Sequence, residues 1–203
     1  MIQISTTTGP TTEPITTAQA KEHLRVTFAD DDAYIDALIT TARQVVEARS
    51  GMRLFTQTVV LRADYWSEIG FSDPHRLDLV SLRVAPVQSV TSVNYYDDDD
   101  IDRTLSTALY WTDLDSVPCR MQIKDEWPSI NERAGNIRVT MVVGWDNTDN
   151  IPAILKSAIK LLIGHYYENR EEVTDLKLMA IPEGIDRLIF NNPEFHHYST
   201  GSM

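Results

Sequence analysis

The fold is decided by residues 151–167, which read IPAILKSAIKLLIGHYY. Pro152 stands in the first turn of a helix, where a residue without a backbone N–H costs nothing. Apolar side chains then cover most of the helix circumference, and only Lys156, Lys160 and Gly164 leave a narrow polar strip. A helix of this kind has to be covered on more than one side. The cover comes from the rest of this chain or from another subunit, and the sequence permits both.

Two further helices are predicted before the middle of the chain. Thr16 stands three residues before Gln19, which is the spacing of a capping box at the start of a short helix that ends near Val26. A longer helix begins at Asp30-Asp31-Asp32 and ends at Gly51, since carboxylates favour a helix N-terminus and glycine favours the left-handed residue after its end. Its buried stripe comprises Ile35, Leu38, Ala42, Val45, Val46 and Arg49, while Asp36, Arg43, Gln44 and Glu47 are expected mostly elsewhere on the helix.

The pattern between these helices and the last one changes to a period of two. Thr58–Tyr65 and Ile137–Val143 alternate apolar and polar side chains, as half-buried strands do. Val87–Tyr96 alternates less regularly, and two short strands are expected at 108–112 and 121–124. Prolines fall between these segments or at their edges, where a missing N–H does least harm. The middle of the chain is therefore predicted to be a small, mostly antiparallel β unit.

The sequence as a whole predicts an α+β protein with a helical core built from its N- and C-terminal segments. The core comprises 15–55 and 148–190, with the last helix of residues 151–167 extended to about Glu172 and a short helix from Pro182 to Phe190. The inserted β unit comprises 56–147. Residues 1–14 are expected to be a flexible polar arm, and 191–203 a flexible tail, because neither offers a periodic apolar face.

Composition excludes several classes of protein. The 203 residues contain 18 Lys and Arg against 30 Asp and Glu, a net charge of -12, which argues against a protein that grips DNA phosphates. The single Cys119 excludes an intrachain disulfide and a multi-cysteine metal cage. Lys156 and Lys160 interrupt the most apolar stretch, so no membrane span is predicted, and the first residues lack the features of a secretory signal.

Motifs that carry chemistry are few. No glycine-rich phosphate loop occurs, and nothing beside Cys119 marks it as a nucleophile. Asp97-Asp98-Asp99-Asp100 with Asp102 has the oxygen ligands that a hard cation prefers, but the run follows a strand and is more typical of an exposed hairpin tip. His165 and Glu168 share a helix face, and His196-His197 lies in the tail, yet further ligands for a metal are not evident. No catalytic, cofactor or metal site is predicted.

Four phrases of the sequence carry a resemblance to a known family. They are ITTAQAKEHLRV at 15–26 with the Asp30–Asp32 run, ARQVVE at 42–47 with Gly51, IPAILKSAI at 151–159, and HYYENRE at 165–171. The chain resembles the head–tail connector (adaptor) proteins of tailed bacteriophages. The β segment resembles the longer members, through LRVAPVQSV at 82–90 and Trp127-Pro128.

The resemblance implies a structural protein of the virion and no enzymatic activity. Such proteins are made in the host cytoplasm and form a homo-oligomeric ring, twelvefold here, at the head–tail junction. The ring docks beneath the portal protein, carries the next neck or tail protein, and lets DNA pass without specific binding. Residues expected to contact a neighbouring subunit or the portal are Ile154, Ile159, Ile163, Tyr166, Tyr167 and Arg170.

Two other functions remain open at the level of sequence. One is a small metal-dependent enzyme that uses the carboxylates of Asp97–Asp102. The other is a transient assembly factor, which helps particles to form and then leaves them. Metal analysis would identify the enzyme, and mass spectrometry of purified particles would identify the assembly factor by its absence.

Overall fold

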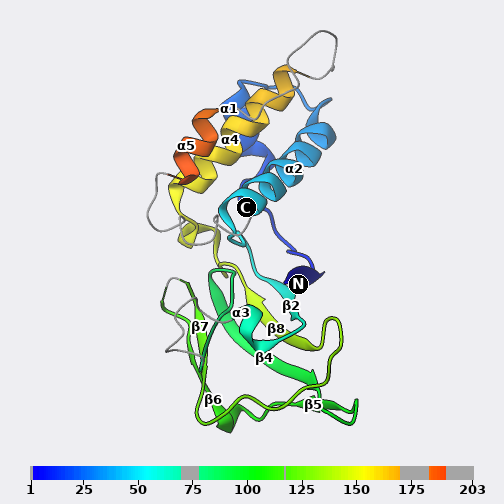
Figure 1. Cartoon of the computed structure of the whole chain (residues 1–203). Coiled ribbons are helices and arrows are strands. Elements are labelled where there is room, and N and C mark those ends of the chain that lie inside the picture. Colours follow the sequence, from blue (N-terminus) through cyan, green and yellow to red (C-terminus); the bar gives the residue numbers. More distant parts are fainter. Residues whose placement is uncertain (1, 70–77, 117, 170–182, 191–203) are drawn as a thin grey trace. The chain divides into compact units, whose positions relative to one another are not determined.

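The computed structural model describes residues 2–69, 78–116, 118–169 and 183–190 (Figure 1). The chain divides into two compact units, each built from segments far apart in the sequence. A β unit comprises Met1–Thr11 and Thr56–Gly144, and a helical unit comprises Thr12–Phe55 and Trp145–Met203. The predicted α+β class is confirmed, with a helical core from both ends of the chain and antiparallel sheets inserted between them.

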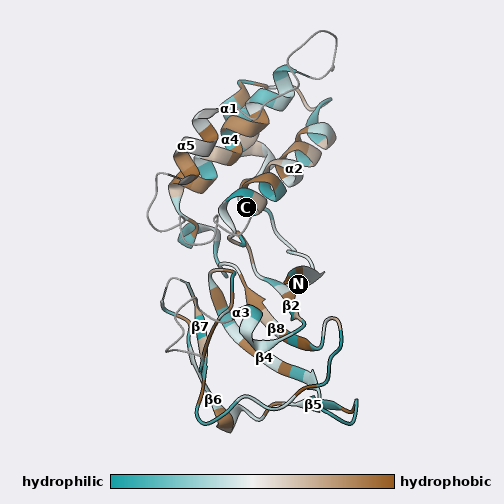
Figure 2. Cartoon of the chain, viewed as in Figure 1, coloured by the Kyte–Doolittle hydropathy of each residue, from teal (hydrophilic) through white to brown (hydrophobic). Residues whose placement is uncertain are grey.

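The described residues of the helical unit form four helices, namely α1 (Thr17–Leu24), α2 (Asp32–Ser50), α4 (Ala153–Glu168) and α5 (Glu183–Phe190), with a 3-10 turn at Thr148–Asn150. α2 packs against α4, while α1 and α5 each pack against both of them. The core between them is aliphatic, and its fully buried side chains include Ile35, Ile39, Leu155, Ile159, Leu162 and Ile163. Hydrophobic segments accordingly run along α2 and α4 in Figure 2. No helix among the described residues has the length and apolar character needed to cross a bilayer.

The helix ends are fixed by the residues that the sequence singles out. The Thr16 hydroxyl accepts a hydrogen bond from the backbone N–H of Gln19, whose side chain accepts one from the N–H of Thr16, so the predicted capping box is present. α1 stops at Arg25, which adopts the left-handed conformation. Gly51 follows α2 with φ of 71°, a value that glycine adopts without steric cost. These signals are local, which explains why the sequence places them well.

In the β unit, the described residues form two antiparallel sheets and one short helix, α3 (Trp66–Ile69). The first sheet has the order β1-β2-β8-β4-β5 and the second the order β3-β7-β6. The bounds are Gln3–Thr8 (β1), Gln57–Ala63 (β2), Leu79–Ser81 (β3), Val87–Tyr96 (β4), Asp102–Thr104 (β5), Tyr110–Asp113 (β6), Arg120–Ile123 (β7) and Ile137–Val143 (β8), with a 3-10 turn at Thr107–Leu109.

β8 is the central strand of the larger sheet and pairs with both β2 and β4. Its side chains alternate between buried and half-buried, with Ile137, Val139, Met141 and Val143 all fully buried, as the period of two predicts. The register with β4 shifts at two places, between Val87 and Ser89 and between Val90 and Ser92. These shifts account for the less regular alternation of β4, because an extra residue turns the following side chains to the other face.

The expectation that residues 1–14 form a flexible arm is wrong for residues 3–8. They form β1, which pairs antiparallel with β2 from Gln3 opposite Arg62 to Thr8 opposite Thr58. The stretch is rich in Thr, which favours strands, and an edge strand needs little apolar surface. Its polar character therefore indicates an edge position and does not indicate disorder.

The prediction and the structure also differ at the end of α4 and in the shortest helices and strands. α4 ends at Glu168, because the backbone of Asn169 leaves the helical region. The N–H of Asn169 makes the last hydrogen bond of the helix, to the carbonyl of His165. The expected extension to about Glu172 is therefore wrong at Asn169. The sequence also misses α3, β3 and β5, which have three or four residues each and too little pattern to detect. The predicted tail at 191–203 lies outside the described residues.

Candidate interaction surfaces

The residues predicted to contact a neighbouring subunit differ greatly in exposure. Ile159 and Ile163 have no exposed surface and belong to the core of the helical unit. Ile154 is partly exposed. Leu161, which the sequence reasoning did not single out, is 46% exposed and lies two turns after Ile154 on nearly the same face of α4. Arg170 lies outside the described residues. The accessible apolar ridge of α4 therefore comprises Ile154 and Leu161.

Tyr166 and Tyr167 join the end of α4 to the beginning of α2. The Tyr167 hydroxyl donates a hydrogen bond to the Asp31 carboxylate, and the Tyr167 ring lies 6.2 Å from the ring of Tyr34. The Tyr34 hydroxyl in turn lies 3.5 Å from the backbone oxygen of Tyr166. Both tyrosines are half-buried, so their contacts within the subunit leave part of each ring accessible.

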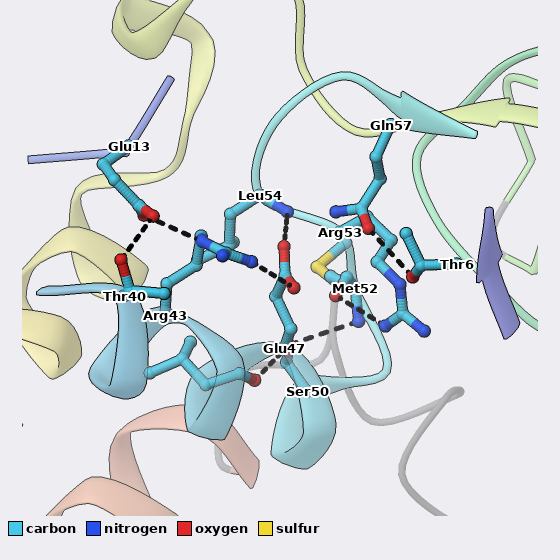
Figure 3. A network of polar contacts seen from close by, with 11 residues as sticks. Thr6, Glu13, Thr40, Arg43, Glu47, Ser50, Met52, Arg53, Leu54 and Gln57 are labelled. Atoms are coloured by element: carbon cyan, nitrogen blue, oxygen red, sulfur yellow. Dashed lines mark hydrogen bonds and ion pairs between the residues drawn. The ribbon is translucent and has the colours of Figure 1, made fainter. Parts of the chain in front are cut away.

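A buried polar network crosses the helical unit around Arg43 (Figure 3). The Arg43 guanidinium bonds to Glu13 (Nε to Oε2, 2.8 Å) and to Glu47 (Nη1 to Oε2, 3.0 Å). The other oxygen of Glu47 accepts the backbone N–H of Leu54 at 2.8 Å. The network ties the segments before α1 and after α2 to α2 itself, because each supplies one partner.

Arg43 and Glu47 were expected mostly away from the buried stripe of α2, and this expectation is wrong. Each is only 6% exposed. Their spacing of four residues is the signal that could have found them, since oppositely charged side chains at that spacing meet on one helix face. Burial of the nearby Arg53 lowers the pKa of its guanidinium, and the negative charge of Glu47 acts in the opposite direction.

A pocket of about 340 Å³ lies on the helical unit beside this network. Its lining comprises Thr12, Glu13, Ile15, Thr16, Thr17, Asp36, Ile39 and Thr40. Ile15 and Ile39 are each only 2% exposed and provide an apolar floor. Asp36 accepts the Thr17 hydroxyl at 2.5 Å, and Glu13 accepts the Thr40 hydroxyl at 2.9 Å. The pocket thus combines apolar, hydroxyl and carboxylate groups.

The Asp97–Asp102 run forms the tip between β4 and β5, where its carboxylates are bound by side chains of the same unit. Asp97 accepts Arg103 at 2.7 Å, Asp100 accepts Arg133 at 2.7 Å, and Asp102 accepts Arg138 at 2.6 Å. The hydrogen bond from Arg103 holds the pKa of Asp97 below its usual range, and that from Arg133 does the same for the pKa of Asp100. Three carboxylates therefore point toward three different cations and do not converge on one point.

The other described candidates for chemistry, Cys119 and His165, belong to different units. Cys119 is buried, and its Sγ lies 3.2 Å from the backbone oxygen of Leu114. The buried Nε2 of His165 makes no hydrogen bond with the described residues, and its ring lies 5.8 Å from the ring of Tyr166. Among the described residues no three His, Cys, Asp or Glu side chains gather as a metal site would require. His196 and His197 lie outside those residues.

The smaller sheet presents an exposed aromatic side chain. Trp111 on β6 is 56% exposed, and the Lys124 ammonium lies 5.0 Å from the centre of its ring. Beside it a hollow of about 160 Å³ is lined by Leu79, Trp111, Thr112, Asp113, Arg120 and Gln122. The carboxylate of Asp113 lies 2.8 Å from the Arg120 guanidinium, which lowers the pKa of Asp113.

Comparison with solved structures gives matches along nearly the whole chain. The chain is similar to a subunit of the neck of an empty gene transfer agent particle computed with C6 symmetry, with a TM-score of 0.72 and 23% identity. It is also similar to a subunit of the virion of a native gene transfer agent particle (TM-score 0.71, 20% identity) and of a native neck computed with C12 symmetry (0.61, 21%).

Each match covers 93% of this chain and 94% of the other. The likeness therefore extends over the helical and the β segments alike, and the fold is shared at low sequence identity. No protein-family model matches the chain, and no curated protein sequence matches it.

Proposed function

We propose that this chain is a structural neck protein of a phage-like particle, where it serves as the connector between head and tail. The single observation that carries the proposal is the shared fold with neck subunits across 93% of the chain. The phrases at 15–26, 42–47, 151–159 and 165–171 support it independently, because they resemble head–tail connector proteins at the level of sequence. The protein would therefore lie at the head–tail junction of the virion.

The neck protein is proposed to act as a homo-oligomeric ring. Closed rings require head-to-tail contacts between two different surfaces of each subunit. The ridge of Ile154 and Leu161 on α4, with the accessible parts of Tyr166 and Tyr167, offers one such surface. The neighbouring structures carry C6 and C12 symmetry, and a ring of twelve subunits satisfies both, so twelve copies are proposed.

The partners proposed for the ring are the portal protein on the head side and another neck or tail protein on the tail side. DNA would pass through the ring without specific binding. A chain with a net charge of -12 supports this role, because retention of DNA depends on Lys and Arg groups that neutralise phosphates. Weak attraction between the DNA and the inner surface of the ring leaves the DNA free to slide.

The role is proposed to be structural, with no reaction catalysed. The carboxylates of Asp97, Asp100 and Asp102 each bind an arginine of the same unit, which is the arrangement of a stabilised hairpin tip. The metal-dependent alternative needs them to share one ion, and the ion pairs favour the structural role.

Electron microscopy of particles tests the proposal. We expect density for this fold as a ring at the head–tail junction, and we expect deletion of the gene to yield heads that lack tails. Mass spectrometry of purified particles separates a neck protein, which is retained, from an assembly factor, which leaves. Complete particles with normal necks that lack this chain would contradict the proposal.

A further inference from the structure

The pocket between residues 12–17 and α2 has an uncompensated charge. The Glu13 carboxylate pairs with Arg43, whereas the described partner of Asp36 is the neutral hydroxyl of Thr17. Asp36 is exposed at the rim, and Ile15 and Ile39 line the floor. A long side chain with an apolar stem and a cationic end fits these features, since lysine buries its methylene groups along apolar surface while its ammonium stays with polar groups.

Such a cation exists in this chain. Among the lysine and arginine side chains that the structure describes, only those of Lys160 and Arg25 make no hydrogen bond or ion pair. Lys160 directly precedes Leu161, the exposed apolar residue of the α4 ridge. Insertion of Lys160 into a pocket would bring Leu161 against the surface around it. Arg25 has no exposed large apolar residue directly beside it in the sequence.

Within the described part of one subunit, the lining of the Asp36 pocket contains no residue of α4. The ring of Tyr34 on α2 contacts the ring of Tyr167 at the end of α4. Asp36 follows two residues later, which at 100° per residue places it about 160° around the helix axis from Tyr34. Asp36 therefore lies away from this contact with α4, and among the described residues Lys160 does not line the pocket of its own subunit.

We propose that Lys160 of one copy of this chain inserts into the Asp36 pocket of the next copy. This inference rests on the proposed function, since it assigns the contact by which neck subunits join. The donor and the acceptor are different surfaces, so each subunit offers one of each, and the contact is of the head-to-tail kind that closes a ring. Asp36 and Lys160 carry opposite charges, which favours this pairing over a pairing of like surfaces.

Disulfide trapping in particles tests the contact directly. The chain is prepared as Asp36→Cys with Lys160→Cys in a Cys119→Ser background, and particles are analysed by non-reducing electrophoresis. We expect a ladder of covalent multimers of this chain. The matched control, Glu22→Cys with Lys160→Cys in the same background, should remain monomeric, because Glu22 is exposed and does not line the pocket.

The outcomes separate this inference from the proposed function. Monomers only, in particles whose necks contain the chain, overturn the contact and leave the function standing. A cross-link from Asp36→Cys to a different protein overturns the contact as well, because the pocket then has another occupant. Absence of the chain from particles overturns the proposed function and the inference with it.

Charge reversal gives a second test that does not depend on cysteine. We expect Asp36→Lys alone and Lys160→Asp alone each to lower the yield of particles with complete necks at least tenfold. The double variant should restore the yield to within about threefold of the parent, since the pair is present again with its signs exchanged. Glu22→Lys is the matched control and should leave the yield unchanged. Failure of the double variant to rescue, with circular dichroism showing a folded chain, contradicts the pairing.

Discussion

Glu47 stabilises the helical unit because it neutralises a buried cation. Its carboxylate is bound by Arg43 and by the backbone N–H of Leu54, and both charged side chains are only 8% exposed. Removing Glu47 leaves the buried Arg43 with Glu13 as its remaining charged partner and leaves the Leu54 N–H without its acceptor. The network around Arg43 is therefore expected to be sensitive to single substitutions.

We predict that Glu47→Ala lowers the free energy of unfolding by about 3–5 kcal/mol. Urea titration followed by circular dichroism at a helical wavelength measures the change. Glu22→Ala on the exposed surface of α1 is the control and is expected to change stability by less than about 0.5 kcal/mol. Equal stability of the two variants would show that Arg43 does not depend on Glu47.

The tip of the β unit carries a charge network that responds to acid. Because Arg103 lowers the pKa of Asp97, the folded state favours the ionised carboxylate. The stabilisation is then complete above the ordinary pKa of Asp, about 4, and is lost as the pH falls through the lowered pKa of the folded state.

We predict that Arg103→Gln raises the pKa of Asp97, because the hydrogen bond that favours its ionised form is removed. Carbon-detected NMR titration of the side-chain carboxyl measures the midpoint in the parent and the variant. Arg133→Gln serves as the matched control, since it should raise the pKa of Asp100 instead. An unchanged Asp97 midpoint in the Arg103 variant would contradict the assignment.

At the level of elements, α4 shows what the sequence can and cannot determine. Its apolar pattern predicts a helix that needs cover on several sides, and the structure places that cover on α1, α2 and α5. The pattern cannot distinguish Ile163, which is fully buried, from Leu161, which is 46% exposed. The distinction depends on where the neighbouring helices lie, and this is a property of tertiary packing.

We predict that two substitutions less than one turn apart on α4 differ greatly in their effect on folding stability. Ile159→Asp places a charge in the core and should cost about 2–5 kcal/mol of folding free energy. Leu161→Asp should leave folding within about 0.5 kcal/mol of the parent, because the side chain is already in contact with water. Urea unfolding measures both. A large loss of stability in the Leu161 variant would show that it is a core residue.

The same two variants separate folding from assembly. If the α4 ridge joins subunits, Leu161→Asp should yield a folded chain that is missing from necks. Leu161→Met is the conservative control and should assemble normally. Normal necks built from the Leu161→Asp chain would remove the ridge from the proposed interface.

Strands were predicted well where the alternation is regular and poorly at the edges of the larger sheet. β8 is central, and its alternation is unambiguous because one face is fully buried. β1 and β5 lie at the two edges, where the backbone pairing of one neighbour supplies the order and the side chains remain largely exposed. Edge strands that are held by backbone pairing alone show little alternation of apolar and polar residues in the sequence. The polar network around Arg43 was missed for a related reason, since burial of its charges depends on partners distant in sequence.

On the scale of the whole molecule, the net charge of -12 disfavours binding to nucleic acid. We predict no retention of duplex DNA in a mobility-shift experiment at physiological salt, with any dissociation constant weaker than about 10⁻⁴ M. The measurement is repeated at low salt, where attraction to phosphates would be strongest. Micromolar binding of duplex DNA would contradict the proposal that DNA slides along the inner surface of the ring.

The topology of the two units determines when each segment finds its partner during synthesis. β1 is made first but pairs with β2, while β4 needs β8, which begins at Ile137. The helical unit closes only when α4, which begins at Ala153, meets α2. The β unit cannot complete its larger sheet before β8 is made, and the helical unit cannot complete its core before α4 is made. Until those elements are made, the nascent chain exposes apolar strands and helices that lack their partners, which is the condition under which chaperones bind.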